Sequence, residues 1–183
     1  GTGWCGGIRA NTCATNPLVK DLYIAEIRPE RLEEVKNLTN PVMATTNYKE
    51  LLKNDNIDAY FISTTPEDIH FPMAKDCMEA GKHVFLEKPL AITLAEADEL
   101  VALAEKSNVK FTIGYSQRFN PKFAYLKKCL SEGTIGQPVA GLVSRHITRG
   151  LGHKIGKRIK LSPAAMEATH DLDKLCKDCM KKY

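Results

Sequence analysis

Short apolar runs, rich in β-branched and aromatic residues, alternate with amphipathic stretches over the first two thirds of the chain. The runs predict strands at residues 22–25, 42–45, 59–63, 83–86 and 110–113. The amphipathic stretches predict helices at residues 8–15, 29–38, 48–53, 67–80 and 93–106. Strands that alternate with helices form a parallel sheet with helices on both faces. The pattern therefore predicts an α/β fold.

Several predicted helix ends carry residues with the matching local preference. Pro29 suits a first helical turn, and Gly81 suits the position just after a helix. Thr93 is followed three residues later by Glu96, which is the spacing of a capping box.

The pattern changes after residue 114. Beyond it we predict a helix at 121–132, a strand at 139–147, an irregular basic segment at 148–162 and a last helical stretch from Pro163. One strand and two helices cannot bury much of a core. We therefore expect one domain at residues 1–116 and the start of a second, incomplete α+β domain at residues 117–183.

Composition narrows the class of protein. The chain has 183 residues, of which 43% are hydrophobic and 26% charged, as in ordinary soluble globular proteins. No apolar run approaches the roughly 18 residues that a membrane-spanning helix needs. The formal charge is +4. The segment from Arg145 to Tyr183 holds ten Lys or Arg but only four Asp or Glu. Few aromatic residues accompany those charges, so we expect no nucleic-acid partner. With no long apolar run, we also expect no membrane partner and a cytoplasmic protein.

The six cysteines give no disulfide framework, and only Cys176 and Cys179 lie close together. Zinc needs four ligands, and a redox C-x-x-C motif opens a helix after a strand. This pair instead lies among lysines in the polar segment 174–183. We therefore expect reduced thiols and no bound metal.

The chain begins with a glycine-rich loop. Gly1, Gly3 and Gly6 form G-x-G-x-x-G, with Trp4 and Cys5 between the second and third glycines. The glycines permit a tight turn, a close approach of backbone to a pyrophosphate, and close packing of helix on strand. The loop predicts a Rossmann-like dinucleotide-binding domain, with a further strand ahead of Gly1. The alternative is an unstructured start of the chain.

Glu26 follows the first predicted strand, 20 residues after Gly6. A carboxylate at this spacing takes the ribose hydroxyls of a dinucleotide. It repels a 2′-phosphate, so the sequence favours NAD over NADP. Arg28 is the alternative signal, because an arginine there would attract that phosphate if it is not simply a surface residue at a helix start.

Residues 60–93 carry a more specific pattern. It runs from Ser63-Thr64-Thr65-Pro66 through His70 to Gly81-Lys82-His83 and Glu87-Lys88-Pro89. This run closely resembles the glucose–fructose oxidoreductase/inositol dehydrogenase/MocA family (Gfo/Idh/MocA). The segments at 114–121 and at 162–173, with His170-Asp171, are similar to later motifs of the same family. The resemblance extends over essentially the whole chain.

The resemblance implies roles in the first domain. Lys88 would approach the substrate oxygen, and a cation at that end of a parallel strand stabilises a developing alkoxide. The implied cofactor contacts come from Ser63, Thr64, Thr65, Pro66, His70, Glu87, Lys88 and Gln117. Arg28 joins them as a candidate on its charge alone. Alternatives remain: Glu87 and Lys88 could form a surface ion pair, residues 64–66 could cap a helix, and His70 could be a core residue.

The resemblance also implies that His170 moves the hydroxyl proton, a task that suits imidazole near neutral pH. The family's dehydrogenases carry an aspartate four residues before this histidine, where Met166 stands here. Glu167 could take its place, and Asp173 could orient the ring. Arg118 and Asp173 would join Lys88 and His170 in holding the substrate.

The expected protein is an NAD(P)-dependent dehydrogenase. It would transfer a hydride between nicotinamide and a secondary hydroxyl or ketone of a sugar, cyclitol or related polyol. The alternative is a dinucleotide-binding regulator or scaffold without turnover, which the Met166 departure favours. Assembly into a homo-oligomer stays open.

Overall fold

A computed structural model describes residues 1–158 and 162–178 of the chain. The chain divides into two compact units, Gly1–Ile113 and Gly114–Tyr183.

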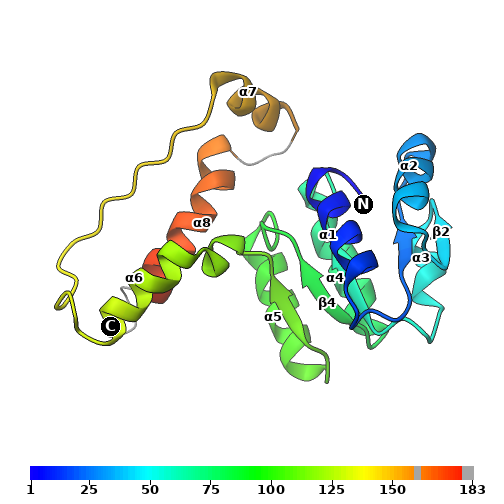
Figure 1. The fold of residues 1–183 in the computed structure, drawn as a ribbon, viewed down its shortest axis with the longest axis horizontal. Coiled ribbons are helices and arrows are strands. Elements are labelled where there is room, and N and C mark those ends of the chain that lie inside the picture. Colours follow the sequence, from blue (N-terminus) through cyan, green and yellow to red (C-terminus); the bar gives the residue numbers. More distant parts are fainter. Residues whose placement is uncertain (159–161, 179–183) are drawn as a thin grey trace. The chain divides into compact units, whose positions relative to one another are not determined.

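The first unit alternates helices and strands as the hydrophobic pattern predicts (Figure 1). Its elements are α1 (Trp4–Thr15), β1 (Tyr23–Ala25), α2 (Pro29–Thr39), β2 (Met43–Thr45), α3 (Tyr48–Leu52), β3 (Ala59–Ile62), the 3₁₀ turn η1 (Glu67–Ile69), α4 (His70–Glu79), β4 (His83–Leu86), α5 (Leu94–Lys106) and β5 (Phe111–Ile113). Each predicted strand and helix of this unit is present, with ends that differ by a few residues. The predicted helix at 67–80 divides into η1 and α4.

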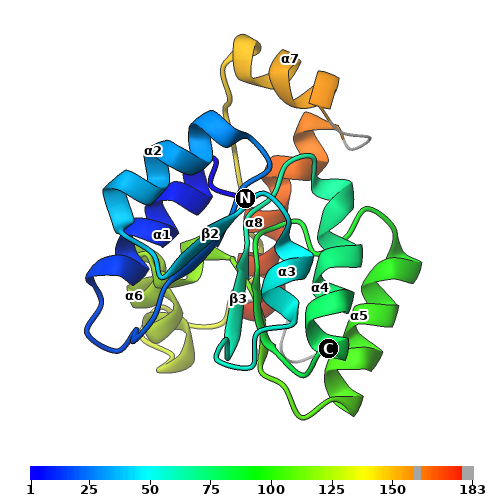
Figure 2. The same cartoon turned by 90° about the vertical axis from the view of Figure 1, so that its right-hand side faces the viewer.

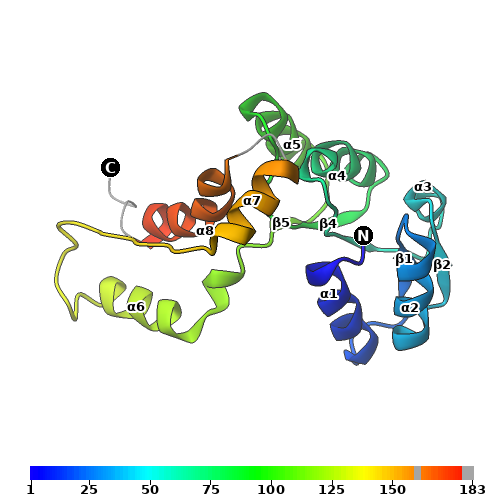
Figure 3. The ribbon, with the colours of Figure 1, turned by 90° about the horizontal axis from the view of Figure 1, so that it is seen from above.

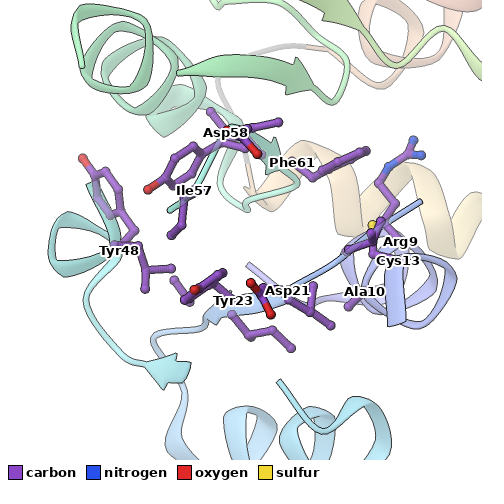
Figure 4. A pocket seen from close by; sticks show the side chains of 18 of the residues that line it. Arg9, Ala10, Cys13, Asp21, Tyr23, Tyr48, Ile57, Asp58 and Phe61 are labelled. Carbon is purple, nitrogen blue, oxygen red and sulfur yellow. The ribbon is translucent and has the colours of Figure 1, made fainter. Parts of the chain in front are cut away.

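All strand pairs are parallel, but they form two sheets. One sheet pairs β1 with β2, and the other has the order β3-β4-β5. Figure 3 shows the two groups apart. A cavity of about 710 Å³ lies between β1 and β3, lined by both strands and by the start of the chain (Figure 4).

Helices cover both faces of the strands, as predicted. Figure 2 shows α1 and α2 on one side, and α3, α4 and α5 on the other. The main core lies under α4 and α5, where their apolar faces meet the three-stranded sheet. Its fully buried residues are Ile62, Ala74, Cys77, Met78, Val84, Leu86 and Leu100. The structure confirms the predicted Rossmann-like α/β class.

Local signals operate as the sequence indicates. The hydroxyl of Thr93 accepts from the backbone N–H of Glu96, and the Glu96 carboxylate accepts from the backbone N–H of Thr93. Gly81 has a φ of 72°, the left-handed conformation that glycine adopts without strain.

The second unit holds helices only in its described part, namely η2 (Ser116–Phe119), α6 (Pro121–Ser131), α7 (Arg149–Arg158) and α8 (Pro163–Asp178). The helix predicted from Pro121 is confirmed. The strand predicted at 139–147 is wrong: Val139 and Leu142 are each 98% exposed. A strand needs a partner for its backbone groups, and none of the described residues of this unit forms one.

The irregular segment predicted at 148–162 is also wrong, because α7 occupies most of it. Glycines disfavour helices, which explains the prediction. Two contacts offset that preference: Thr148 accepts from the backbone N–H groups of Leu151 and Gly152, and Ile155 is buried. α7 packs on α8.

Candidate dinucleotide and substrate site

The glycine-rich loop leads directly into α1. A methyl group on Gly6 would come within 2.1 Å of the carbonyl oxygen of Gly1, so only glycine allows this turn. The space beside Gly3 is open, and Gly3 precedes α1 with no side-chain cap. The first N–H groups of α1, from Trp4 and Cys5 onward, are therefore left without a capping side chain. This is the geometry in which a helix N-terminus binds phosphate.

Glu26 lies at the end of β1 and is 4% exposed. One carboxylate oxygen accepts from the backbone N–H of Thr2 at 2.6 Å and from its hydroxyl at 2.9 Å. The other accepts from the backbone N–H and the Nε of Arg28, at 3.2 and 2.9 Å. Burial alone raises the pKa of Glu26, but the bonds from Arg28 and Thr2 outweigh it and lower the pKa to about 2.

These four bonds change the interpretation of Glu26. A carboxylate has about four acceptor positions, and protein donors occupy that number. The side chain clamps the glycine-rich loop to β1, and it can accept ribose hydroxyls only by exchanging one of these bonds. The Arg28 side chain is 58% exposed beside it.

Ser63 and Thr64 follow β3 and lie against the loop. A methyl group on Gly1 would meet the carbonyl oxygen of Ser63 at 3.1 Å and the side chain of Thr64 at 3.2 Å. The hydroxyls of Ser63 and Thr64 are buried and have no hydrogen-bond partner in the described protein. Buried polar groups normally have partners. Two unsatisfied hydroxyls beside a phosphate-type loop therefore fit a bound dinucleotide.

His70, at the start of α4, is 1% exposed. Its Nδ1 lies 2.8 Å from the carbonyl oxygen of Pro89, and its Nε2 lies 3.1 Å from that of Thr64. The ring thus joins the segments that follow β3 and β4. This favours the core role that the sequence left open for His70 over a direct contact with the cofactor.

Glu87, Lys88 and Pro89 follow β4, at the carboxyl end of the sheet. Lys88–Pro89 is a cis peptide bond, as is Thr65–Pro66. Glu87 pairs with Arg9 of α1, whose Nε donates to its carboxylate at 2.8 Å. Glu87 therefore pairs with Arg9, and not with Lys88 in the surface ion pair that the sequence left open as an alternative. Sequence reasoning missed Arg9, because nothing in the motif marks a partner 78 residues away.

In the second unit, α8 carries His170, Glu167 and Asp173. The ring of Tyr115 meets that of His170 edge-on, with centroids 6.5 Å apart. Asp173 accepts from Arg118 Nε at 2.8 Å. Gln117 lies on η2 next to Arg118.

Arg145 is a second residue that the sequence did not single out. It donates to both carboxylate oxygens of Asp171 and lies 3.8 Å from Glu167. Met166 is 5% exposed. The Glu167 carboxylate, which was expected to take the place of the family's aspartate, lies close to the positive charge of Arg145.

Cys5, Cys13, Cys77 and Cys129 are free thiols, whereas Cys179, like all of residues 179–183, lies outside the described residues. Within residues 1–158 and 162–178, no group of three or more potential ligands is placed to hold a metal ion. Over the same ranges, no helix combines the length and the apolar character required to cross a bilayer.

Taken together, the parallel strands, the uncapped loop–helix junction and the buried hydroxyls define a dinucleotide-binding domain of the Rossmann class. Residues 1–115 match the model of the oxidoreductase family with an NAD-binding Rossmann fold, Gfo/Idh/MocA. The chain belongs to this family, as its Thr-Pro and Glu-Lys-Pro motifs predict.

Individual relatives agree. The chain is 33% identical over 138 residues to the uncharacterized oxidoreductase YrbE of Bacillus subtilis, covering 75% of this chain and 40% of that protein. It is 34% identical over 115 residues to a myo-inositol 2-dehydrogenase of Thermotoga maritima, covering 63% and 34%. The crystal structure of myo-inositol 2-dehydrogenase from Lactobacillus plantarum matches with a TM-score of 0.81 and 27% identity, over 98% of this chain and 55% of that one. The chain spans well under half the length of the two curated relatives.

Proposed function

We propose that the protein is an NAD(P)-dependent dehydrogenase that acts on a secondary hydroxyl or ketone of a sugar, cyclitol or related polyol. The observation that carries this proposal is the position of Lys88. It follows β4 at the carboxyl end of the sheet, in the unit that holds the glycine-rich loop and the unsatisfied hydroxyls after β3. Ligands of parallel α/β sheets bind at that end.

The residues have distinct proposed tasks. The start of α1 binds the pyrophosphate, and Ser63 and Thr64 offer hydroxyls to the dinucleotide. Arg28, exposed beside Glu26, is the candidate contact for the adenosine ribose or its 2′-phosphate. When bound, the nicotinamide supplies the hydride acceptor or donor.

Lys88 donates to the substrate oxygen and stabilises negative charge that develops there. His170 takes or returns the hydroxyl proton, and Arg118 with Asp173 is proposed to hold other substrate groups. Glu167 is a weaker candidate for orienting His170, because Arg145 lies 3.8 Å from its carboxylate.

A non-catalytic dinucleotide-binding protein is the second candidate. The observation that favours it is the buried Met166, at the position where the family's dehydrogenases carry an aspartate. Met166 puts an apolar side chain four residues before His170, where a carboxylate would stabilise the charged form of the imidazole. Dinucleotide binding without turnover on any polyol would support this candidate.

The test is a turnover assay with a panel of polyols and with NAD and NADP. We expect Lys88→Ala to lower kcat about 100-fold or more, the usual loss when a donor to a developing oxyanion is removed. The matched control is Lys106→Ala, which removes an exposed lysine at the end of α5. Equal turnover by Lys88→Ala and the unmodified protein would contradict the proposed role of Lys88.

A further inference from the structure

We propose that Arg9 is a positioning residue, which holds the Glu87 carboxylate and so prevents it from pairing with the ammonium group of Lys88. The inference rests on the proposed function of Lys88 and extends it to a residue of α1 that lies outside the Glu-Lys-Pro motif. The two residues beside Lys88 are each tied to another helix, Glu87 to Arg9 of α1 and Pro89 to His70 of α4.

Arg9 is held from two directions. Its Nε donates to the Glu87 carboxylate at 2.8 Å, with a second contact from Nη2 to the same oxygen. Its guanidinium carbon lies 4.3 Å from the ring centroid of Phe85, and that ring stacks on Phe61 at 5.2 Å. Figure 4 shows Arg9 rising from α1 on the side of the view where Phe61 lies. Stacking and ion pairing together restrict the guanidinium to one place.

The pair is partly removed from water. The side chains of Arg9 and Glu87 are 27% and 13% exposed, against 37% and 49% for the surface pair of Lys75 and Glu99. Coulomb attraction and the cost of losing a partner both grow as water is excluded. Glu87 therefore needs a cation close by. Its backbone N–H donates to the carbonyl oxygen of Ile62 at 2.9 Å, which holds its main chain against β3.

Burial raises the pKa of the Cys5 thiol, and the charges of Glu87, Arg9 and Lys88 all act on that same thiol. The Lys88 ammonium therefore lies in the same neighbourhood as Glu87, where it could become the partner of the carboxylate if Arg9 is lost. An ammonium paired with Glu87 has fewer protons and less charge to offer to a substrate oxygen. Arg9 would thus act on Lys88 through Glu87, while α1 also presents its N-terminus to the pyrophosphate. In this way α1 would contribute both to binding of the cofactor and to the availability of Lys88.

A purely structural role for Arg9 gives a different expectation, and a second substitution separates the two. Arg9→Met removes the charge but keeps an unbranched side chain that packs on Phe85. Adding Glu87→Gln removes the competing carboxylate. If Arg9 only stabilises the fold, the labelling rate of Lys88 and kcat should be as low in the double variant as in Arg9→Met. If Arg9 restrains Glu87, both quantities should rise again in the double variant.

The control is Lys75→Met. Lys75 also lies over an aromatic ring, at 6.0 Å from the centroid of Phe71, and pairs with Glu99 at 2.5 Å, so it links α4 to α5 and does not bind Glu87. Far-ultraviolet circular dichroism and thermal unfolding establish that each variant folds. If Arg9→Met does not fold, Arg9→Gln takes its place, because it also removes the charge. Arg9→Lys keeps the charge, and we expect it to behave like the unmodified protein.

The first readout needs no turnover. The full chain is treated with trinitrobenzenesulfonate, and the labelling rate of Lys88 is followed by peptide mass spectrometry. We expect Lys88 to label several-fold more slowly in Arg9→Met, and to return toward the normal rate in the double variant. Equal rates in the unmodified protein, Arg9→Met and the double variant would overturn the inference.

The second readout is steady-state kinetics with a polyol that the unmodified protein oxidises. We expect Arg9→Met to lower kcat about tenfold with little change in the KM for the dinucleotide, and the double variant to recover part of that loss. A double variant as slow as Arg9→Met would overturn the inference. Absence of turnover in the unmodified protein would contradict the proposed function alone, because the labelling rates still test Arg9.

Discussion

At the scale of single residues, Glu26 shows how contacts redefine a motif residue. Its position after β1 predicts a contact with the ribose of a dinucleotide. In the structure its two oxygens receive four hydrogen bonds from Thr2 and Arg28. The same carboxylate therefore stabilises the loop in the absence of any ligand, and its ionisation becomes part of the stability of the protein.

The Glu26 carboxylate predicts a specific acid sensitivity. Its pKa in the folded protein, about 2, lies below its ordinary value of 4.5. The stabilisation is therefore complete above the ordinary value and is lost as the pH falls toward 2. We expect Glu26→Gln to lower the free energy of unfolding at pH 7 by up to about 3 kcal/mol, and this deficit to shrink between pH 5 and pH 2.

Urea titrations at a series of pH values measure this effect, with the exposed Glu30→Gln of α2 as control. A Glu26→Gln deficit that stays constant down to pH 2 would show that the four hydrogen bonds do not stabilise the ionised form.

At the scale of elements, helix ends were the most predictable features of the chain, because their signals are local. The Thr93 and Glu96 capping box forms in full at the start of α5. The hydrophobic pattern of residues 139–147 predicts a strand, but none forms there. A strand, unlike a helix cap, depends on a partner elsewhere in the fold.

Removal of the capping box tests the local contribution. We expect Thr93→Ala to lower the free energy of unfolding by about 1 kcal/mol, since the backbone N–H of Glu96 loses its acceptor. Thr93→Ser keeps that acceptor and should cost much less. Urea unfolding of the three proteins gives the comparison, and equal losses for Ala and Ser would mean that the methyl group of Thr93, not its hydroxyl, matters.

At the scale of the whole molecule, the proposed dinucleotide would contact residues that belong to both sheets. The proposed contacts come from α1, from the end of β1 and from the residues after β3 and β4, while the strands themselves form two sheets. A ligand that binds only the folded protein adds its binding free energy to stability. The bound dinucleotide should therefore raise the stability of the first unit.

Thermal unfolding with NAD, NADH, NADP and NADPH measures this linkage. At 100 times its Kd, a dinucleotide should add about 2.7 kcal/mol. Gly6→Ala should lose most of the effect, because the added methyl group would lie 2.1 Å from the carbonyl oxygen of Gly1. A larger shift with the 2′-phosphorylated forms would assign that end of the ligand to Arg28. An unchanged shift in Gly6→Ala would refute the proposed role of the loop.

The sequence by itself determined the parallel α/β class, the order of strands and helices in the first unit and the family, because periodicity, capping and the Glu-Lys-Pro run act over short stretches. Only the tertiary structure decided that the strands form two sheets, that Arg9 holds Glu87 and that Arg145 draws Glu167 and Asp171. These pairings join residues that are 20 to 80 positions apart or depend on which strand edges meet. Hydrophobic periodicity records which face of an element is buried, but it does not record which partner buries it.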